Sequence, residues 1–132
     1  MVLASVPQLD KIYTVEEYFE LEKHSDIRHE FVNGKLIAMT GKSIIANRIA
    51  GNCDFHLQLT FRKQGYDVIR HDVRVITKPN KIYRYPDIVL AKRDEISDTH
   101  AVMHPILLVE VTCENSTKFY NKLTEYTALP ST

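Results

Sequence analysis

Two short apolar runs, each interrupted by one carboxylate, constrain the fold of this chain most strongly. The first is YRYPDIVLAK at residues 83–92, which contains Asp87, and the second is ILLVEVTC at residues 106–113, which contains Glu110. Apolar runs of this length are typical of strands that are covered on both faces. Because burial of an unpartnered carboxylate carries a large free-energy cost, each acid needs a partner in the folded protein.

Three kinds of partner satisfy a buried acid: a salt bridge, backbone N–H donors or a metal ion. Two acids on neighbouring strands repel each other unless a cation lies between them, and Asp and Glu oxygens are hard ligands that suit Mg²⁺ or Mn²⁺. Pro86 removes one backbone donor, so we expect an irregular strand next to Asp87. The alternative is that the two acids form structural salt bridges with Arg84, Arg74 or Lys122.

The rest of the chain alternates between helical and strand patterns. Its 132 residues, of which 44% are hydrophobic, suffice for one compact domain over residues 1–132. The predicted order is α-β-β-α-β-β-β-α, with helices near 13–23, 44–64 and 116–128 and strands on both sides of Asn33-Gly34 and at 66–77, 84–91 and 106–113. This order predicts an α/β (α+β) core of about five strands.

Local signals fix several element boundaries. Thr14 and Glu17 have the spacing of a capping box, and Ser43 precedes the long helical run. Asn33-Gly34 predicts a two-residue hairpin turn, because both residues tolerate positive φ. Gly65 marks the end of the long helix.

Two helical stripes are expected to face the core. The stripe of the long helix consists of Ile45, Ile49, Cys53, His56 and Thr60. Within it, His56 is predicted to be a core residue. The stripe of the last helix consists of Phe119, Leu123 and Tyr126.

Composition excludes some classes of protein and leaves others open. No apolar run approaches the roughly 20 residues of a membrane span, and the N-terminus lacks the pattern of a signal peptide. Cys53 and Cys113 have no metal-binding spacing, which favours reduced thiols in a cytoplasmic protein. Net charge is zero, but residues 62–93 hold nine Lys or Arg against three Asp, a net charge of +6. This basic segment indicates either phosphate contacts or strand exteriors that discourage edge pairing.

Several segments together resemble the Uma family of endonucleases, in the restriction-endonuclease-like superfamily with the PD-(D/E)XK motif. The resemblance covers nearly the whole chain and is carried by YTVEEYFELEK, RHEFVNGKLIAM, ANRIAGN, YPDIVL, PILLVEV and STKFYNKLTEY. It implies a restriction-endonuclease-like core, with a mixed sheet flanked by helices. It also implies hydrolysis of phosphodiester bonds in DNA with Mg²⁺ or Mn²⁺.

The resemblance assigns roles to individual residues. Asp87 matches the motif aspartate, Glu110 the acid on the next strand, and Glu30 an additional family glutamate; all three are implied metal ligands. The motif lysine is absent, because Thr112 occupies its position two residues after Glu110. Lys122 on the following helix matches a migrated lysine.

Other basic side chains have weaker assignments. Lys118, one helical turn before Lys122, is the internal alternative for the catalytic cation. Arg70, Arg74 and Arg84 are candidate contacts to the DNA backbone, and the first two alternatively neutralise nearby acids.

The chain also departs from the family pattern. The connection from Thr117 to Lys122 is about three residues shorter than in the family, and the chain ends at Thr132 where relatives continue with further strands. A C-terminally truncated member of the family leaves a sheet edge or face uncovered, so we expect a homodimer.

Three functions fit these observations. The first is a metal-dependent DNA endonuclease. The second is a catalytically inactive remnant of the same fold that binds nucleic acid or protein, which the neutral net charge favours slightly. The third is a metal-dependent hydrolase of a small phosphoester.

Overall fold

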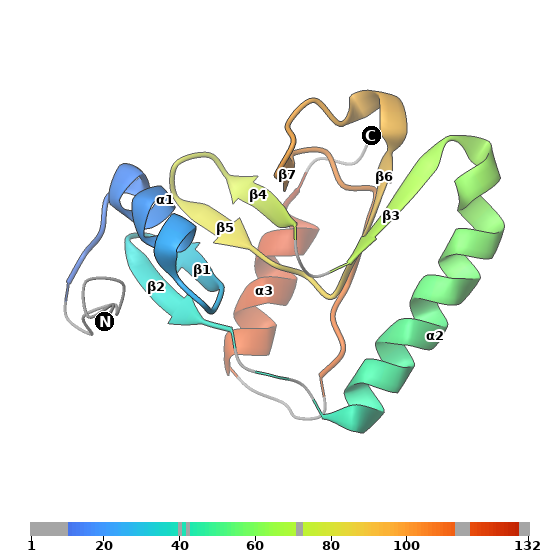
Figure 1. Cartoon of the computed structure of the whole chain (residues 1–132), viewed down its shortest axis with the longest axis horizontal. Helices are drawn as coiled ribbons and strands as arrows, with labels where there is room; N and C mark the ends of the chain where they lie inside the picture. The colour runs from blue at the N-terminus through green and yellow to red at the C-terminus, as the bar shows by residue number, and fades with distance from the viewer. Residues whose placement is uncertain (1–10, 40, 42, 71–72, 113–116, 130–132) are drawn as a thin grey trace. The chain divides into compact units, whose positions relative to one another are not determined.

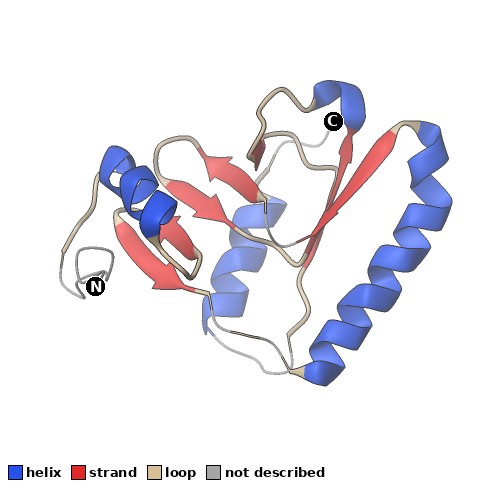
Figure 2. Cartoon of the chain, in the orientation of Figure 1, coloured by secondary structure: helices blue, strands red, loops and turns tan. Residues whose placement is uncertain are grey.

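The computed structural model describes residues 11–39, 41, 43–70, 73–112 and 117–129, and its residues fall into two compact units. The first unit is Met1–Gly41 with Lys78–Arg84, and the second is Lys42–Thr77 with Tyr85–Thr132. Figure 1 shows the elements in chain order, and Figure 2 shows that both units contain helix and strand. The predicted mixed α/β class is therefore confirmed. The single domain over residues 1–132 stays a prediction.

The first unit contains one helix and an antiparallel strand group in the order β2-β1-β5. Its elements are α1 (Val15–His24), β1 (His29–Val32), β2 (Lys35–Ala38) and β5 (Ile82–Arg84). Thr14 and Glu17 form the predicted capping box at the start of α1. Asn33 and Gly34 have φ values of 49° and 89°, so the predicted hairpin turn is also confirmed.

Aromatic packing joins the helix of the first unit to its strands. The Tyr18 ring lies 5.0 Å from the Phe31 ring and 5.9 Å from the Tyr83 ring, measured between centroids. The Tyr18 hydroxyl donates a 2.6 Å hydrogen bond to the carbonyl oxygen of His29. Because a buried carbonyl without a donor is costly, this bond fixes α1 against β1 in one position.

The second unit contains two helices and the remaining described strands. Its elements are α2 (Ile44–Phe61), the 3₁₀ turn η2 (Arg62–Gln64), β3 (Tyr66–Arg70), β4 (Arg74–Lys78), β6 (Ile88–Lys92), the 3₁₀ turn η3 (Arg93–Glu95), β7 (Ala101–Val102), β8 (Leu107–Val109) and α3 (Thr117–Thr127). The strands β3-β6-β8 form an antiparallel sheet in that order, and β4 pairs with β7 in parallel. The unit thus combines both kinds of strand pairing.

Two of the strands predicted from the sequence are each divided in the structure. The run 66–77 is divided into β3 and β4, with His71 and Asp72 outside the described residues. The run 84–91 is interrupted between β5 and β6, where Pro86 lacks the N–H that a ladder needs. The strand therefore breaks beside Asp87, as the sequence predicted.

A cluster of small apolar side chains forms the core of the second unit. Val75, Val89, Ala91 and Val102 are each at most 2% exposed. After α2 the chain turns at Gly65, whose φ is 87°, and β3 runs back from the end of the helix (Figure 1). Among the described residues, no helix has the length and apolarity needed to cross a membrane.

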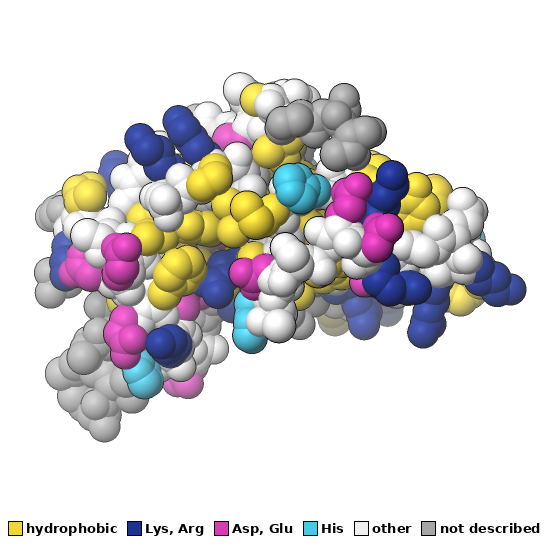
Figure 3. Space-filling model, turned by 90° about the horizontal axis from the view of Figure 1, so that it is seen from above, with side chains coloured by type: hydrophobic (Ala, Val, Ile, Leu, Met, Phe, Trp, Pro, Cys, Tyr) yellow, Lys and Arg dark blue, Asp and Glu magenta, His cyan; other side chains and the backbone are white. Residues whose placement is uncertain are grey.

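The predicted inward face of α2 is wrong. Ile45 is 68% exposed, Ile49 is 51% exposed and His56 is also exposed. The covered side of the helix instead carries residues at helical spacing that are buried or half-buried, namely Ala46, Ala50, Cys53 and Leu57. The larger isoleucines face outward. Figure 3 shows one face of the molecule, on which hydrophobic side chains lie exposed among charged ones.

Candidate active site

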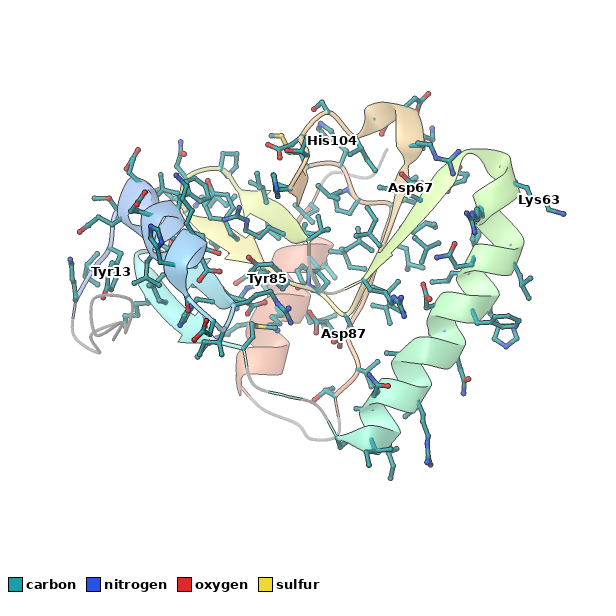
Figure 4. All side chains as sticks on the ribbon, viewed as in Figure 1. Tyr13, Lys63, Asp67, Tyr85, Asp87 and His104 are labelled. Atoms are coloured by element: carbon teal, nitrogen blue, oxygen red, sulfur yellow. The ribbon has the colours of Figure 1, made fainter. Side chains whose placement is uncertain are left out.

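Asp87 and Glu110 lie at the same end of the β6–β8 strand pair. The antiparallel register pairs Ile88 with Val109; Asp87 directly precedes Ile88 and Glu110 directly follows Val109, so the two acids extend this register by one position. Residues opposite each other in such a pair share one face, with Cβ atoms about 4.5–5.5 Å apart. Figure 4 labels Asp87 just before β6 and Asp67 near the other end of the paired β3 and β6 strands. The two acids from the apolar runs are thus neighbours across the strands.

A backbone donor holds Asp87 in place. The residue is 7% exposed, and its Oδ2 atom accepts a 2.6 Å hydrogen bond from the N–H of Val111. A backbone N–H that donates to a buried carboxylate oxygen offsets part of the cost of burial. Because Val111 follows Glu110 directly, this bond also ties the two acidic segments together.

Glu110 is held by two side chains of α3. Its Oε1 atom accepts a 2.9 Å hydrogen bond from the Tyr126 hydroxyl, and the Lys122 Nζ atom lies 3.6 Å from the same oxygen. The side chains of Glu110 and Lys122 are only 12% and 18% exposed. Lys122 and Tyr126 are four residues apart, so they lie on one side of the helix. The ammonium and the hydroxyl therefore both act on the carboxylate of Glu110.

Glu30 has a buried basic partner. It lies in β1 of the first unit, and its Oε1 atom is 3.0 Å from Nη1 of Arg84 in β5. The two side chains are 2% and 5% exposed. The structure therefore places Glu30 in a buried ion pair, as a salt bridge within the first unit.

The same ion pair holds Arg84, which the sequence predicted as a contact to the DNA backbone. A contact to the DNA backbone needs a guanidinium group on the surface, and the Arg84 side chain is buried. Arg70 differs, since it is exposed at the end of β3, opposite Ile88 and so one position from Asp87. Its Nη1 atom lies 3.8 Å from Oδ2 of Asp54 in α2. Arg74 is half-buried in β4.

The donor set at this strand end suits a hard divalent cation. Among residues 11–39, 41, 43–70, 73–112 and 117–129, no group of three or more His, Cys, Asp or Glu could hold a metal ion. Asp87 and Glu110 supply two carboxylates. Mg²⁺ is usually bound by one or two carboxylates, with waters and substrate phosphate oxygens completing its shell. Two acids on adjacent strands therefore fit this kind of site, and they do not form a closed cage.

Sequence analysis missed the contribution of Tyr126. The residue was assigned to the apolar stripe of the last helix, whereas its hydroxyl contacts Glu110. The Lys-x-x-x-Tyr spacing was the available signal, because it puts two polar groups on one side of a helix. Cys113 and the backbone of 113–116 lie outside the described residues, as does the side chain of Lys118.

Comparisons with known proteins agree with this fold. The model of the Uma2 family, described as "Putative restriction endonuclease", matches residues 15–130. A Synechocystis protein named "Uncharacterized protein sll1609" is 30% identical over 112 residues, which cover 83% of this chain and 63% of that protein. The chain thus spans less than two thirds of the length of this relative.

A solved structure from Anabaena variabilis is also similar. It is described as "a putative nuclease belonging to DUF820", and the match has a TM-score of 0.74 at 16% identity, over 89% of this chain and 69% of that chain. At this identity the likeness shows the fold alone. The predicted nuclease-like fold is therefore confirmed, and the family match confirms the resemblance seen in the sequence.

The Glu30–Arg84 pair generates a stability prediction. Replacement of Arg84 by Met should lower the free energy of unfolding by about 3–5 kcal/mol, because it leaves the buried Glu30 without this cation. The double variant Glu30→Gln/Arg84→Met should recover most of the loss. Urea denaturation measures both effects, with the exposed Arg70→Met as the matched control at about 0.5 kcal/mol or less. A loss for Arg84→Met no larger than for the control would contradict a structural role for the pair.

Proposed function

The chain belongs to the Uma2 family, and on this premise we propose that it is a metal-dependent endonuclease that hydrolyses phosphodiester bonds in DNA. One observation carries the proposal: Asp87, Glu110 and Lys122 gather at one end of the β6–β8 pair. Two acids and one ammonium are the groups that phosphodiester hydrolysis needs to hold a cation and to stabilise charge. The nuclease descriptions of the family and of the Anabaena neighbour support the same reaction class.

Asp87 and Glu110 are the proposed ligands of Mg²⁺ or Mn²⁺. A bound divalent cation supplies Lewis-acid polarisation of the scissile phosphate and lowers the pKa of an attacking water. The contribution of the chain is to hold the two carboxylates still: Val111 N–H fixes Asp87, and α3 fixes Glu110. Glu30, predicted as a third metal ligand, forms an ion pair with Arg84 in this structure. The Arg84 variants distinguish a structural role of Glu30 from a role as metal ligand.

Lys122 is the proposed catalytic cation. Its ammonium is 3.6 Å from Oε1 of Glu110. A positive charge in this place stabilises the negative charge that develops on the phosphate oxygens. Thr112, at the usual motif position, has no charge to offer and is exposed.

DNA is the proposed substrate, and exposed basic residues of the segment 62–93 are the proposed backbone contacts. Arg70 lies at the strand end that carries Asp87, and Lys63 extends from η2 (Figure 4). Contacts of this kind position the phosphate backbone without reading its sequence. A cytoplasmic location is proposed with it, supported by Cys53, which is a free thiol.

Loss of either acid should abolish cleavage. With supercoiled plasmid and Mg²⁺ or Mn²⁺, Asp87→Asn and Glu110→Gln should each reduce the cleavage rate by at least about 100-fold, because each keeps its size but loses a charged ligand. Both should also weaken Mn²⁺ binding, measured by calorimetry without DNA. The matched control is Asp94→Asn, an exposed acid in η3 at the other end of β6.

The outcomes of this assay separate the three functions. Cleavage of plasmid but not of a small phosphoester supports the endonuclease. Hydrolysis of the small ester alone would point to the third function. No Mn²⁺ binding and no cleavage by the wild-type protein would contradict the proposal and favour the inactive remnant.

Lys122 should be needed for turnover and not for folding. Lys122→Ala should reduce cleavage by about 100-fold or more, because the variant lacks the ammonium beside the Glu110 carboxylate. The urea midpoint should change little. Lys118→Ala, one turn earlier, is the matched control and should cleave at close to the wild-type rate. If Lys122→Ala cleaves as well as the wild type, the assignment of the catalytic cation is wrong.

A homodimer is also part of the proposal, supported by the exposed side of α2. Five large apolar side chains of this helix are at least half exposed: Ile44, Ile45, Ile49, Phe55 and Leu59. An apolar surface of this kind favours a protein partner, and closed two-fold dimers are the commonest assemblies.

Sedimentation velocity at micromolar concentration tests the dimer. The wild-type protein should sediment as a dimer and Ile49→Glu as a monomer, because the charge would be buried in the interface. Lys35→Glu, on the exposed side of β2, should remain dimeric. A wild-type monomer would remove this part of the proposal.

A further inference from the structure

Tyr126 makes a short hydrogen bond to the side chain of Glu110. The distance from its hydroxyl to Oε1 is 2.9 Å, compared with 3.6 Å from Nζ of Lys122 to the same atom. An ionised carboxylate only accepts hydrogen bonds, so the phenol is the donor. Lys122 therefore makes a looser ionic contact, and Tyr126 makes the directional one.

The two contacts differ in rigidity. A lysine carries its charge on a flexible four-carbon stem, whereas a tyrosine ring is rigid and has only two side-chain torsions. The ring of Tyr126 is half-buried in α3, and the carboxylate that it holds is only 12% exposed. A carboxylate fixed at one oxygen also rotates less about its terminal bond, so the direction of its second oxygen is restricted.

We propose that Tyr126 is a positioning residue, whose hydroxyl fixes the carboxylate of Glu110 in the orientation that receives a divalent cation. The inference rests on the proposed function, because it concerns the same site. It adds that α3 has two separate tasks: Lys122 supplies charge, and Tyr126 supplies orientation. Hydrogen bonds to a ligating side chain typically change metal affinity by about 10–100-fold when they are removed.

Calorimetric titration of the full chain with MnCl₂ in the absence of nucleic acid tests this role. Tyr126→Phe keeps the ring and removes the hydroxyl, so its affinity for Mn²⁺ should fall by about 10–100-fold. The matched control is Tyr66→Phe, in which a half-buried tyrosine that packs edge-on against Phe61 loses its hydroxyl. This control should bind Mn²⁺ as the wild type does.

A rescue variant separates positioning from a general loss of structure. Tyr126→4-aminophenylalanine puts an N–H donor at the same place on the ring and should restore Mn²⁺ affinity to within a few-fold of the wild type. It also serves as the second variant if Tyr126→Phe fails to fold. A folded 4-aminophenylalanine variant that binds as weakly as Glu110→Gln would overturn the inference.

The remaining outcomes distinguish the inference from the proposed function. If the wild type and Tyr126→Phe bind Mn²⁺ equally well, Tyr126 does not position Glu110, while the metal site itself stands. If the wild type binds no Mn²⁺, the proposed function fails and the inference fails with it. Equal weakening in Tyr126→Phe and Tyr66→Phe would also overturn the inference, because the effect would not depend on the contact to Glu110.

Discussion

The burial of two carboxylates side by side is the constraint on which the candidate site depends. Asp87 and Glu110 occupy adjacent positions at the end of the β6–β8 pair, where their charges oppose each other. Each carboxylate has its own partners. The backbone N–H of Val111 donates to Asp87, and two side chains of α3 contact Glu110. Each donor offsets part of the desolvation cost, and none of them removes the negative charge of the pair. This strand end is the proposed binding site for a divalent cation.

Features set by local backbone chemistry were predictable from the sequence. The capping box at Thr14, the positive φ values at Asn33-Gly34 and the left-handed Gly65 after the long helix follow from the residues within a few positions of each. The break in the strand before Asp87 follows in the same way from Pro86, which cannot donate to a ladder. The pairing of the two apolar runs as β6 and β8 was also predictable, because each run needed neighbours to cover it.

Features that depend on which partner fills the space were not predictable. The isoleucines of α2 define an inward stripe in the sequence, but in the structure the smaller residues Ala46 and Ala50 are the covered ones. Arg84 sits in a basic segment, yet Glu30, which is 54 residues away in the sequence, draws it into a buried ion pair. In the sequence, Tyr126 looks like one more aromatic residue of a helical stripe. The hydrogen bond from its hydroxyl becomes evident only when the position of Glu110 is known.

Anomalous X-ray diffraction from crystals soaked in Mn²⁺ tests the central claim most directly. The account predicts one strong peak that lies about 2.0–2.6 Å from a carboxylate oxygen of Asp87 and from one of Glu110. The Glu30–Arg84 ion pair should remain intact in the same crystal. A Mn²⁺ peak that is bound elsewhere, or the absence of any peak between these two acids at saturating Mn²⁺, would contradict the account.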